Sequence, residues 1–155
     1  LVCAASANEA YRRSYEITSL SKPIKALGLT CPVSCLHEMA KSQDEMTREW
    51  MQVLYGGEPE QSSLWNCSDY ADILTDCKEL PSIYILTTKG DQKYYRQSLA
   101  LHDLMNRKQI EHVYREWESM ENKDLGHVFN VLYPACQDSR AANQEMVYFF
   151  LNVRR

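Results

Sequence analysis

The chain has 155 residues, of which 45% are hydrophobic and 25% charged, with a formal net charge of −4. This length and composition are typical of one compact domain, and the charge balance gives no sign of a nucleic-acid partner. No apolar stretch is long enough to predict a membrane span.

The N-terminal residues and the cysteines indicate the compartment. The stretch from Leu1 has no basic start and soon turns polar, so it does not resemble a signal peptide. Among six cysteines, Cys31 and Cys35 form a C-x-x-x-C pair near His37, but no further ligands follow at zinc-like spacing. We therefore expect reduced, structural cysteines, no metal and a cytoplasmic location.

The first half of the chain predicts a helix, a strand and a helical insertion. Residues 1–15 are rich in alanine, which favours a helix, and the apolar run 26–33 predicts a buried strand. Ser42 and Glu45 have the spacing of a capping box, and Gly56 with Gly57 predicts the end of that helix. Its apolar positions recur at helical spacing, at Met46, Trp50, Val53 and Leu54. A short helix is expected at 68–77, with Ser68 or Asp69 as its cap.

The second half alternates strands and helices. Residues 82–88 are rich in β-branched and aromatic side chains and predict a central strand, and residues 110–116 predict another. The helix between them has an apolar face, and a final helix is expected with Ser139 as its cap. The apolar face of the middle helix comprises Tyr94, Leu101, Leu104 and Met105, and that of the final helix comprises Met146, Phe149, Phe150 and Val153.

This order of elements predicts an α/β fold with a mainly parallel sheet and helices on both of its faces. Three strands are few for such a sheet, and one edge would be left open. We therefore expect further N-terminal structure beyond Leu1, and self-association through the exposed edge.

Polar side chains follow two of the predicted strands. Asp91 comes directly after the strand 82–88, and His127 follows the strand 110–116 on a polar loop. In open α/β sheets the carboxyl ends of the strands gather functional groups, and an acid followed by a histidine is the later part of the chain order Ser, Asp, His. Taken alone, Asp91 could instead cap the next helix, and His127 could be a turn residue.

The segments TTKGDQKYYRQSLALHDLM, IEHVYRE and LGHVFNVLYP resemble the C-terminal half of α/β-hydrolase esterases, in the branch of acetyl esterases and hormone-sensitive-lipase-like enzymes. The resemblance covers about residues 80–153. It implies that residues 37–76 are a cap-like helical insertion and that residues 1–15 are the helix after the nucleophile elbow. Asp91 and His127 are then the acid and base of a catalytic triad.

One departure from that family is large. The sequence contains no G-x-S-x-G and no glycine-rich oxyanion loop. Ser6 is a poor nucleophile candidate, because Ala4 and Asn8 stand where glycines are needed and no strand precedes it. We therefore expect the nucleophile just upstream of Leu1, and an inactive chain in its absence.

The resemblance implies a carboxylic ester hydrolase that acts on short-acyl or acetyl esters of small molecules without a cofactor. The alternative is a non-catalytic interaction module on a truncated hydrolase scaffold. A flavodoxin-like domain has no support, because no glycine-rich phosphate loop follows a strand. The other candidates have structural interpretations. No acid pair is formed by Glu49, Glu58 and Glu60, and the core is the expected place of Trp50, Trp65 and Trp117. We expect structural roles for His37, His102 and His112, although His37 could reach a substrate.

Overall fold

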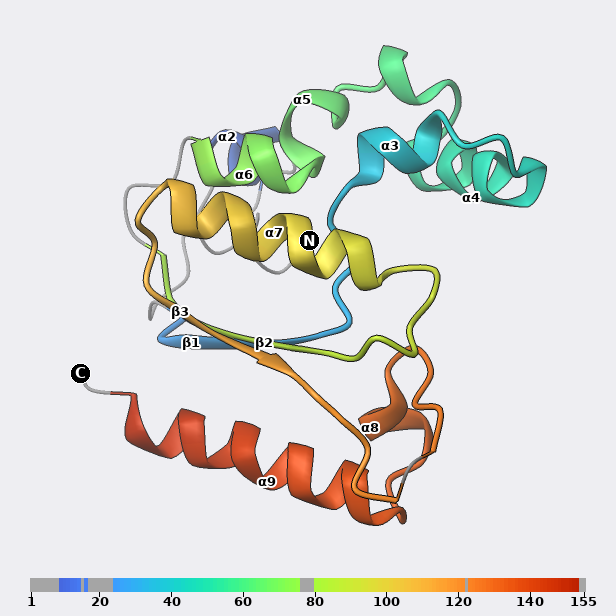
Figure 1. The fold of residues 1–155 in the computed structure, drawn as a ribbon. Helices are drawn as coiled ribbons and strands as arrows, with labels where there is room; N and C mark the ends of the chain where they lie inside the picture. Colours follow the sequence, from blue (N-terminus) through green and yellow to red (C-terminus); the bar gives the residue numbers. More distant parts are fainter. Residues whose placement is uncertain (1–8, 15, 17–23, 76–79, 122, 154–155) are drawn as a thin grey trace. The chain divides into compact units, whose positions relative to one another are not determined.

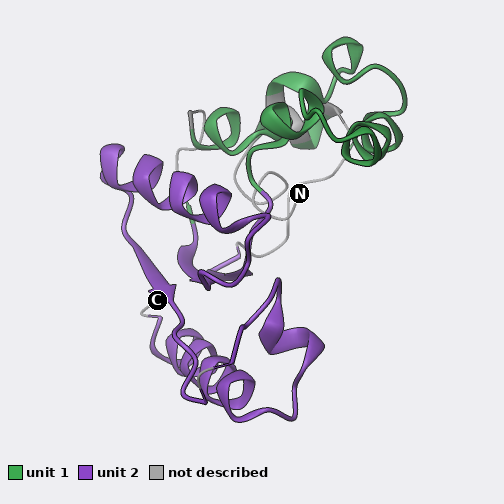
Figure 2. Ribbon diagram, turned by 45° about the vertical axis from the view of Figure 1, so that its right-hand side comes forward, with its two compact units in different colours: residues 1–23, 34–80 green, residues 24–33, 81–155 purple. Residues whose placement is uncertain are grey.

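The computed structural model describes residues 9–14, 16, 24–75, 80–121 and 123–153. The chain divides into two compact units, as Figure 2 shows. Unit 1 comprises residues 1–23 and 34–80, and unit 2 comprises residues 24–33 and 81–155.

Unit 2 contains a three-stranded parallel sheet in the order β1 (Ala26–Thr30), β2 (Ser82–Thr87), β3 (His112–Glu116) (Figure 1). The parallel α/β architecture and the central position of β2 confirm the prediction. Ile85 and Leu86 of β2 are completely buried, which is expected of a parallel strand covered on both faces. Each strand is shorter than its predicted run. β1 ends at Thr30 because Cys31 takes a left-handed conformation with φ 44°.

Two helices cover the sheet from opposite faces, α7 (Tyr95–Arg107) and α9 (Gln137–Asn152) (Figure 1). Successive side chains of a strand point to opposite faces, so β2 contributes to both cores. The core on the α9 side contains Tyr84, Leu86, Trp117, Leu125, Phe129 and Ala142. Gly28 lets α9 lie close to β1, since a Cβ there would come within 2.6 Å of Met146 Sδ.

The predicted cap of α9 is wrong. The helix begins at Gln137 after Cys136, whose sulfur accepts the Ser139 backbone N–H at 3.3 Å. Ser139 lies inside the first turn, and its buried hydroxyl donates to the carbonyl of Phe129 at 3.1 Å. Ser139 thus attaches α9 to the segment that precedes it and does not cap the N-terminus of the helix.

Unit 1 is helical in its described residues. Its elements are α2 (Glu9–Ser14), α3 (Leu36–Ala40), α4 (Glu45–Tyr55), the 3-10 helix η1 (Pro59–Gln61), α5 (Trp65–Ser68) and α6 (Tyr70–Thr75). The predicted helix 68–77 is therefore two short helices. They meet at Asp69, whose carboxylate accepts the Ala71 N–H at 3.2 Å, as a cap should. Most of residues 1–15 lies outside the described residues.

The N-cap of helix α4 lies two residues after the predicted one, Ser42. Asp44 is its N-cap and accepts the Thr47 N–H at 3.1 Å, whereas the Ser42 hydroxyl accepts the N–H of Asp44. The C-terminal prediction is confirmed, since Gly56 adopts the left-handed conformation with φ 74°.

The apolar face of α4 is largely exposed to solvent. Trp50 and Val53 are 67% and 77% exposed, whereas Met51 and Tyr55 are buried. The helical spacing of apolar residues therefore predicted the helix but not the side that packs. Within the described residues, no helix combines the length and the apolar character that crossing a membrane requires.

Candidate catalytic site

Asp91 lies directly beyond β2, in the turn that leads into α7. Its carboxylate Oδ1 accepts the Tyr94 N–H at 3.2 Å, and its carbonyl accepts the Tyr95 N–H at 2.8 Å. The residue is only 2% exposed. Asp91 therefore uses one carboxylate oxygen to hold the turn before α7, but it does not cap that helix, whose N-cap position is Tyr94.

The second oxygen faces His127. His127 Nδ1 lies 2.8 Å from Asp91 Oδ2, and the imidazole packs beside the Tyr94 ring at a centroid distance of 4.7 Å. An ionised carboxylate can only accept, so Nδ1 carries the proton and Nε2 holds a lone pair. The His127 side chain is 38% exposed. The predicted meeting of these two side chains is present, while their catalytic role remains a prediction.

The segment that carries His127 is anchored on both sides of the histidine. Leu125 and Phe129 are buried in the core on the α9 side of the sheet, at 7% and 0% exposure. Val128 has φ 46°, a left-handed conformation that is rare for a β-branched residue. Such backbone strain persists only where surrounding packing enforces it, and here the two buried neighbours do so.

Gly90 lets this segment approach Asp91. A Cβ on Gly90 would lie 2.2 Å from the Leu125 carbonyl oxygen and 2.5 Å from Asp124 Oδ1. No side chain fits there without moving backbone, so glycine is required for the close approach of the two segments. By contrast, a Cβ on Gly126 would meet no atom within 4 Å.

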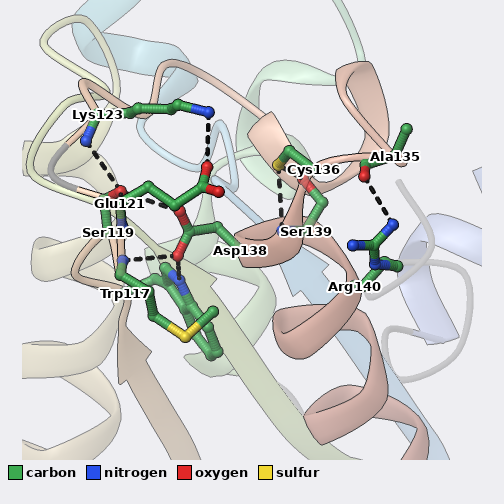
Figure 3. A network of polar contacts seen from close by, with 10 residues as sticks. Trp117, Ser119, Glu121, Lys123, Ala135, Cys136, Asp138, Ser139 and Arg140 are labelled. Atoms are coloured by element: carbon green, nitrogen blue, oxygen red, sulfur yellow. Dashed lines mark hydrogen bonds and ion pairs between the residues drawn. The ribbon is translucent and has the colours of Figure 1, made fainter.

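A buried carboxylate fixes the start of the same loop. Asp138, in the first turn of α9, accepts hydrogen bonds from Trp117 Nε1 at 3.0 Å, Ser119 Oγ at 2.9 Å and the Met120 N–H at 2.9 Å (Figure 3). Burial alone would raise the pKa of Asp138, but these three donors and the charge of Lys123 hold it below its ordinary value. The network ties the chain that leaves β3 to α9.

Glu116, the last residue of β3, is bound to residues that follow β2. Its carboxylate accepts the Tyr95 hydroxyl at 2.6 Å and the Lys89 ammonium at 2.9 Å. These two contacts lower the pKa of Glu116, and the hydrogen bond to Glu116 raises the pKa of Tyr95. The carboxyl ends of β2 and β3 are thus fastened together beside the Asp91–His127 pair.

Cys31 lies at this site, although only Asp91 and His127 were predicted there. One ligand atom from each of Cys31, Asp91 and His127 lies within 4.8 Å of the other two. Cys31 is 1% exposed, and burial raises the pKa of its thiol to about 11, so it is not an activated nucleophile. In the sequence, Cys31 lies inside the predicted strand 26–33, so no local signal marked it as a residue of the site.

The other three histidines make contacts within the fold, and their structural role remains a prediction. His37 stacks on Trp65 with ring centroids 3.8 Å apart, and its Nε2 lies 2.7 Å from the Trp65 carbonyl oxygen. Its backbone N–H also donates to Asp69 Oδ2 at 3.0 Å. The Trp65 carbonyl can only accept, so Nε2 of His37 is a donor and not a free base.

His102 of α7 and His112 of β3 bond to each other, with Nδ1 of His102 2.7 Å from Nε2 of His112. His112 Nδ1 lies 2.8 Å from the Ile110 carbonyl oxygen, and Asn106 Nδ2 lies 3.1 Å from His102 Nε2. The pair joins a helix to a strand and leaves no ring nitrogen available.

Other candidates fall outside the site. Ser6 lies outside the described residues. Trp117 is buried as predicted, whereas Trp50 is exposed, contrary to expectation. Cys136 is a free cysteine outside the site, and the reduced state of the cysteines remains a prediction.

Comparisons with known proteins give the fold. No family model matches the sequence, and no curated protein matches it. Three solved structures of esterase B from Lactobacillus rhamnosis are similar. The structure of esterase B from strain HN001 has a TM-score of 0.82 and 19% identity, and the match covers 98% of this chain and 48% of that one.

The other two structures are of inhibited esterase B. One has a C6-C4 SN3 inhibitor and the other a C4-C4 SN3 tributyrin phosphonate. Each has a TM-score of 0.81 and 21% identity over 97% of this chain, which covers 48% and 46% of those chains. The chain therefore has a partial α/β-hydrolase fold and spans about half the length of the structures it resembles.

Proposed function

We propose that this chain supplies the base and the orienting acid of a carboxylic ester hydrolase. His127 is the general base, and Asp91 orients it. The observation that carries the proposal is the 2.8 Å contact between His127 Nδ1 and the buried Asp91 carboxylate, on successive strand ends of a hydrolase-like fold.

The geometry supports base catalysis in a direct way. Asp91 Oδ1 is held by the Tyr94 N–H, so Oδ2 is directed at His127 Nδ1. The proton on Nδ1 leaves Nε2 free to accept the proton of an attacking hydroxyl and to return it to the leaving alcohol. The carboxylate stabilises the imidazolium formed between these two steps.

The nucleophile belongs, in this proposal, to a segment upstream of Leu1. The sequence has no G-x-S-x-G, and the solved esterases that share the fold are about twice as long. That segment would also provide the backbone N–H groups that stabilise the oxyanion. The 155 residues alone are then inactive. Among the described residues β1 pairs only with β2, so its other edge is where further structure or a second copy would pair in this proposal.

The proposed substrates are small esters with short acyl chains, from acetyl to about six carbons. The sequence resemblance favours acetyl esters, and the inhibitors of the similar esterase B are C4-C4 and C6-C4 compounds. The sequence resemblance implies that residues 37–76, a range that includes α4 and α6, are a cap-like insertion. The proposed reaction needs no cofactor.

A fluorophosphonate probe tests the proposal on the protein that includes the residues upstream of Leu1. Labelling of a serine, together with hydrolysis of nitrophenyl acetate and butyrate, is the expected result. His127→Ala should abolish both, because the serine then has no base. His102→Ala is the matched control and should keep both, since His102 lies in a structural pair.

The alternative of a non-catalytic interaction module predicts the opposite. Folded protein with the upstream residues would remain unlabelled and would hydrolyse neither ester. Equal labelling of the parent and of His127→Ala would also contradict the proposal, because the serine would not depend on His127.

A further inference from the structure

The ends of all three strands contribute a metal-ligating side chain to one location. Cys31 follows β1, Asp91 follows β2, and His127 lies on the segment after β3. A sulfur, a carboxylate oxygen and a ring nitrogen from these residues all lie within 4.8 Å of one another. Among the described residues, no other group of three or more such side chains meets this condition.

We propose that Cys31, Asp91 and His127 form an inhibitory binding site for a thiophilic divalent cation such as Zn²⁺. Sulfur, imidazole and carboxylate are the ligands that zinc takes in proteins, and a thiolate disfavours Mg²⁺ and Ca²⁺. Three protein ligands also leave a fourth tetrahedral position open for water.

The distances fit after small movements. Zinc–ligand bonds of about 2.0–2.3 Å place the ligand atoms of a tetrahedral site roughly 3.3–3.6 Å apart. The His127–Asp91 contact of 2.8 Å would open by roughly 0.5–0.8 Å, and atoms as far apart as 4.8 Å would approach by roughly 1.2–1.5 Å. Rotation of the side chains supplies such shifts, while the strands hold the three backbones in place.

Binding of a divalent cation would change the charge state of this buried cluster. Cys31 and Asp91 are at most 2% exposed, and burial raises the pKa of the Cys31 thiol to about 11, so Zn²⁺ binding must release the thiol proton. The charge of the ion then offsets the thiolate and the Asp91 carboxylate. The His127 side chain is 38% exposed and marks the side from which the ion can enter.

The inhibitory effect rests on the proposed function, whereas the binding does not. A cation on His127 Nε2 would occupy the lone pair of the base, and a cation on Nδ1 would displace the hydrogen bond to Asp91. In either case His127 cannot act as the base while the ion is bound.

The test is titration of the purified chain with Zn²⁺ by calorimetry, and with Co²⁺ by absorption spectroscopy. We expect one ion per chain and a cobalt–thiolate charge-transfer band. Cys31→Ser should weaken binding about tenfold or more and remove the band, because it removes the sulfur ligand. Cys136→Ser, which changes a free cysteine outside the cluster, should leave both unchanged.

Two further variants keep the test decisive if Cys31→Ser does not fold. Asp91→Asn keeps an oxygen for the Tyr94 N–H, and His127→Ala removes a partly exposed side chain. Each should weaken Zn²⁺ binding about tenfold in chains whose circular dichroism matches the parent. Absence of binding to the parent chain, or unchanged binding in folded Cys31→Ser, Asp91→Asn or His127→Ala, would overturn the inference.

The inference and the proposed function can fail separately. Zn²⁺ binding through Cys31 in a protein without hydrolase activity refutes only the proposed function. Hydrolysis through His127 that Zn²⁺ does not inhibit, in a chain that binds none, refutes only the cation site.

Discussion

Two pairs of side chains in unit 2, His102–His112 and Asp91–His127, differ in whether a ring nitrogen is left without a hydrogen bond among the described residues. His102 and His112 form an ordered chain of neutral hydrogen bonds, from the Asn106 amide through both rings to the Ile110 carbonyl. Every ring nitrogen is used. His127 bonds through Nδ1 alone, and among the described residues no hydrogen-bond partner meets its Nε2. The exposure of one nitrogen, with the other held by a buried acid, is the feature that chemistry requires.

The largest expected effect is the loss of kcat when the His127 ring is removed. In the protein that includes the upstream residues, His127→Ala should lower the kcat of the proposed ester hydrolysis by about 10⁴-fold or more, since the proposed mechanism has no other base. His102→Ala should change kcat little and lower thermal stability instead. Steady-state kinetics and thermal unfolding of both variants check this, and similar kcat losses in the two would contradict the distinction.

The next effect concerns the approach of the two segments. Gly90→Ala places a Cβ against the Leu125 carbonyl and should destabilise the fold by about 1–3 kcal/mol. Displacement of His127 by about 1 Å would also lower kcat about 100-fold. Gly126→Ala is the matched control, with open space at its Cβ and an expected change within about 0.5 kcal/mol. Equal effects of the two glycine variants on unfolding and kinetics would show that the close approach is unimportant.

A smaller effect is expected where the His127 loop begins. Asp138→Asn replaces an acceptor of three hydrogen bonds with an amide that must turn a donor toward some of them, at a cost of about 1–3 kcal/mol. The pKa of Asp138 is lowered in the folded chain, so the unfolded chain takes up a proton at a higher pH than the folded chain does. The stability that the Asp138 carboxylate contributes is therefore present above about pH 4 and is lost as the pH falls below that value.

Denaturant unfolding as a function of pH measures this contribution. Asp124→Asn, in the exposed part of the same loop, is the control and should have little effect. If Asp138→Asn unfolds at the same denaturant concentration as the parent, the buried network does not hold the loop.

The smallest expected effect is a pH dependence of stability that arises from the His102–His112 pair. Burial and the charge of His112 lower the pKa of His102, while Asp103 opposes the shift. The neutral form is thus favoured in the folded state, so stability is full above about pH 6.5 and falls as the pH drops below it. His102→Gln, which stays neutral, should show a smaller loss of melting temperature between about pH 7 and 5. An unchanged pH slope in that variant would contradict the assignment.

The fold and the central pair could be predicted because their signals are local. A β-branched run specified β2, and an acid and a histidine beyond successive strands had to meet at one edge of a parallel sheet. Cys31 was missed as a member of the site because a cysteine at a strand end has no local signature. Its position depends on a left-handed backbone that only the folded structure reveals.

The sequence pattern did not predict the N-cap residues of α4 and α9 or the side of α4 that packs. Ser42 and Ser139 can both cap a helix, but Asp44 and Cys136 occupy the cap positions, because several acceptors compete and packing decides between them. The spacing of Trp50 and Val53 predicts a helix without saying what covers it.

The tautomer of His127 is the most direct test of the central claim. Nitrogen-15 NMR of the neutral ring should show a protonated Nδ1 and an unprotonated Nε2. In Asp91→Asn the amide oxygen stays with the Tyr94 N–H, so the amide NH₂ faces Nδ1 and the ring proton should move to Nε2. An Nε2-protonated ring in the parent chain, or a tautomer that does not depend on Asp91, would contradict the assignment of His127 as a base oriented by Asp91.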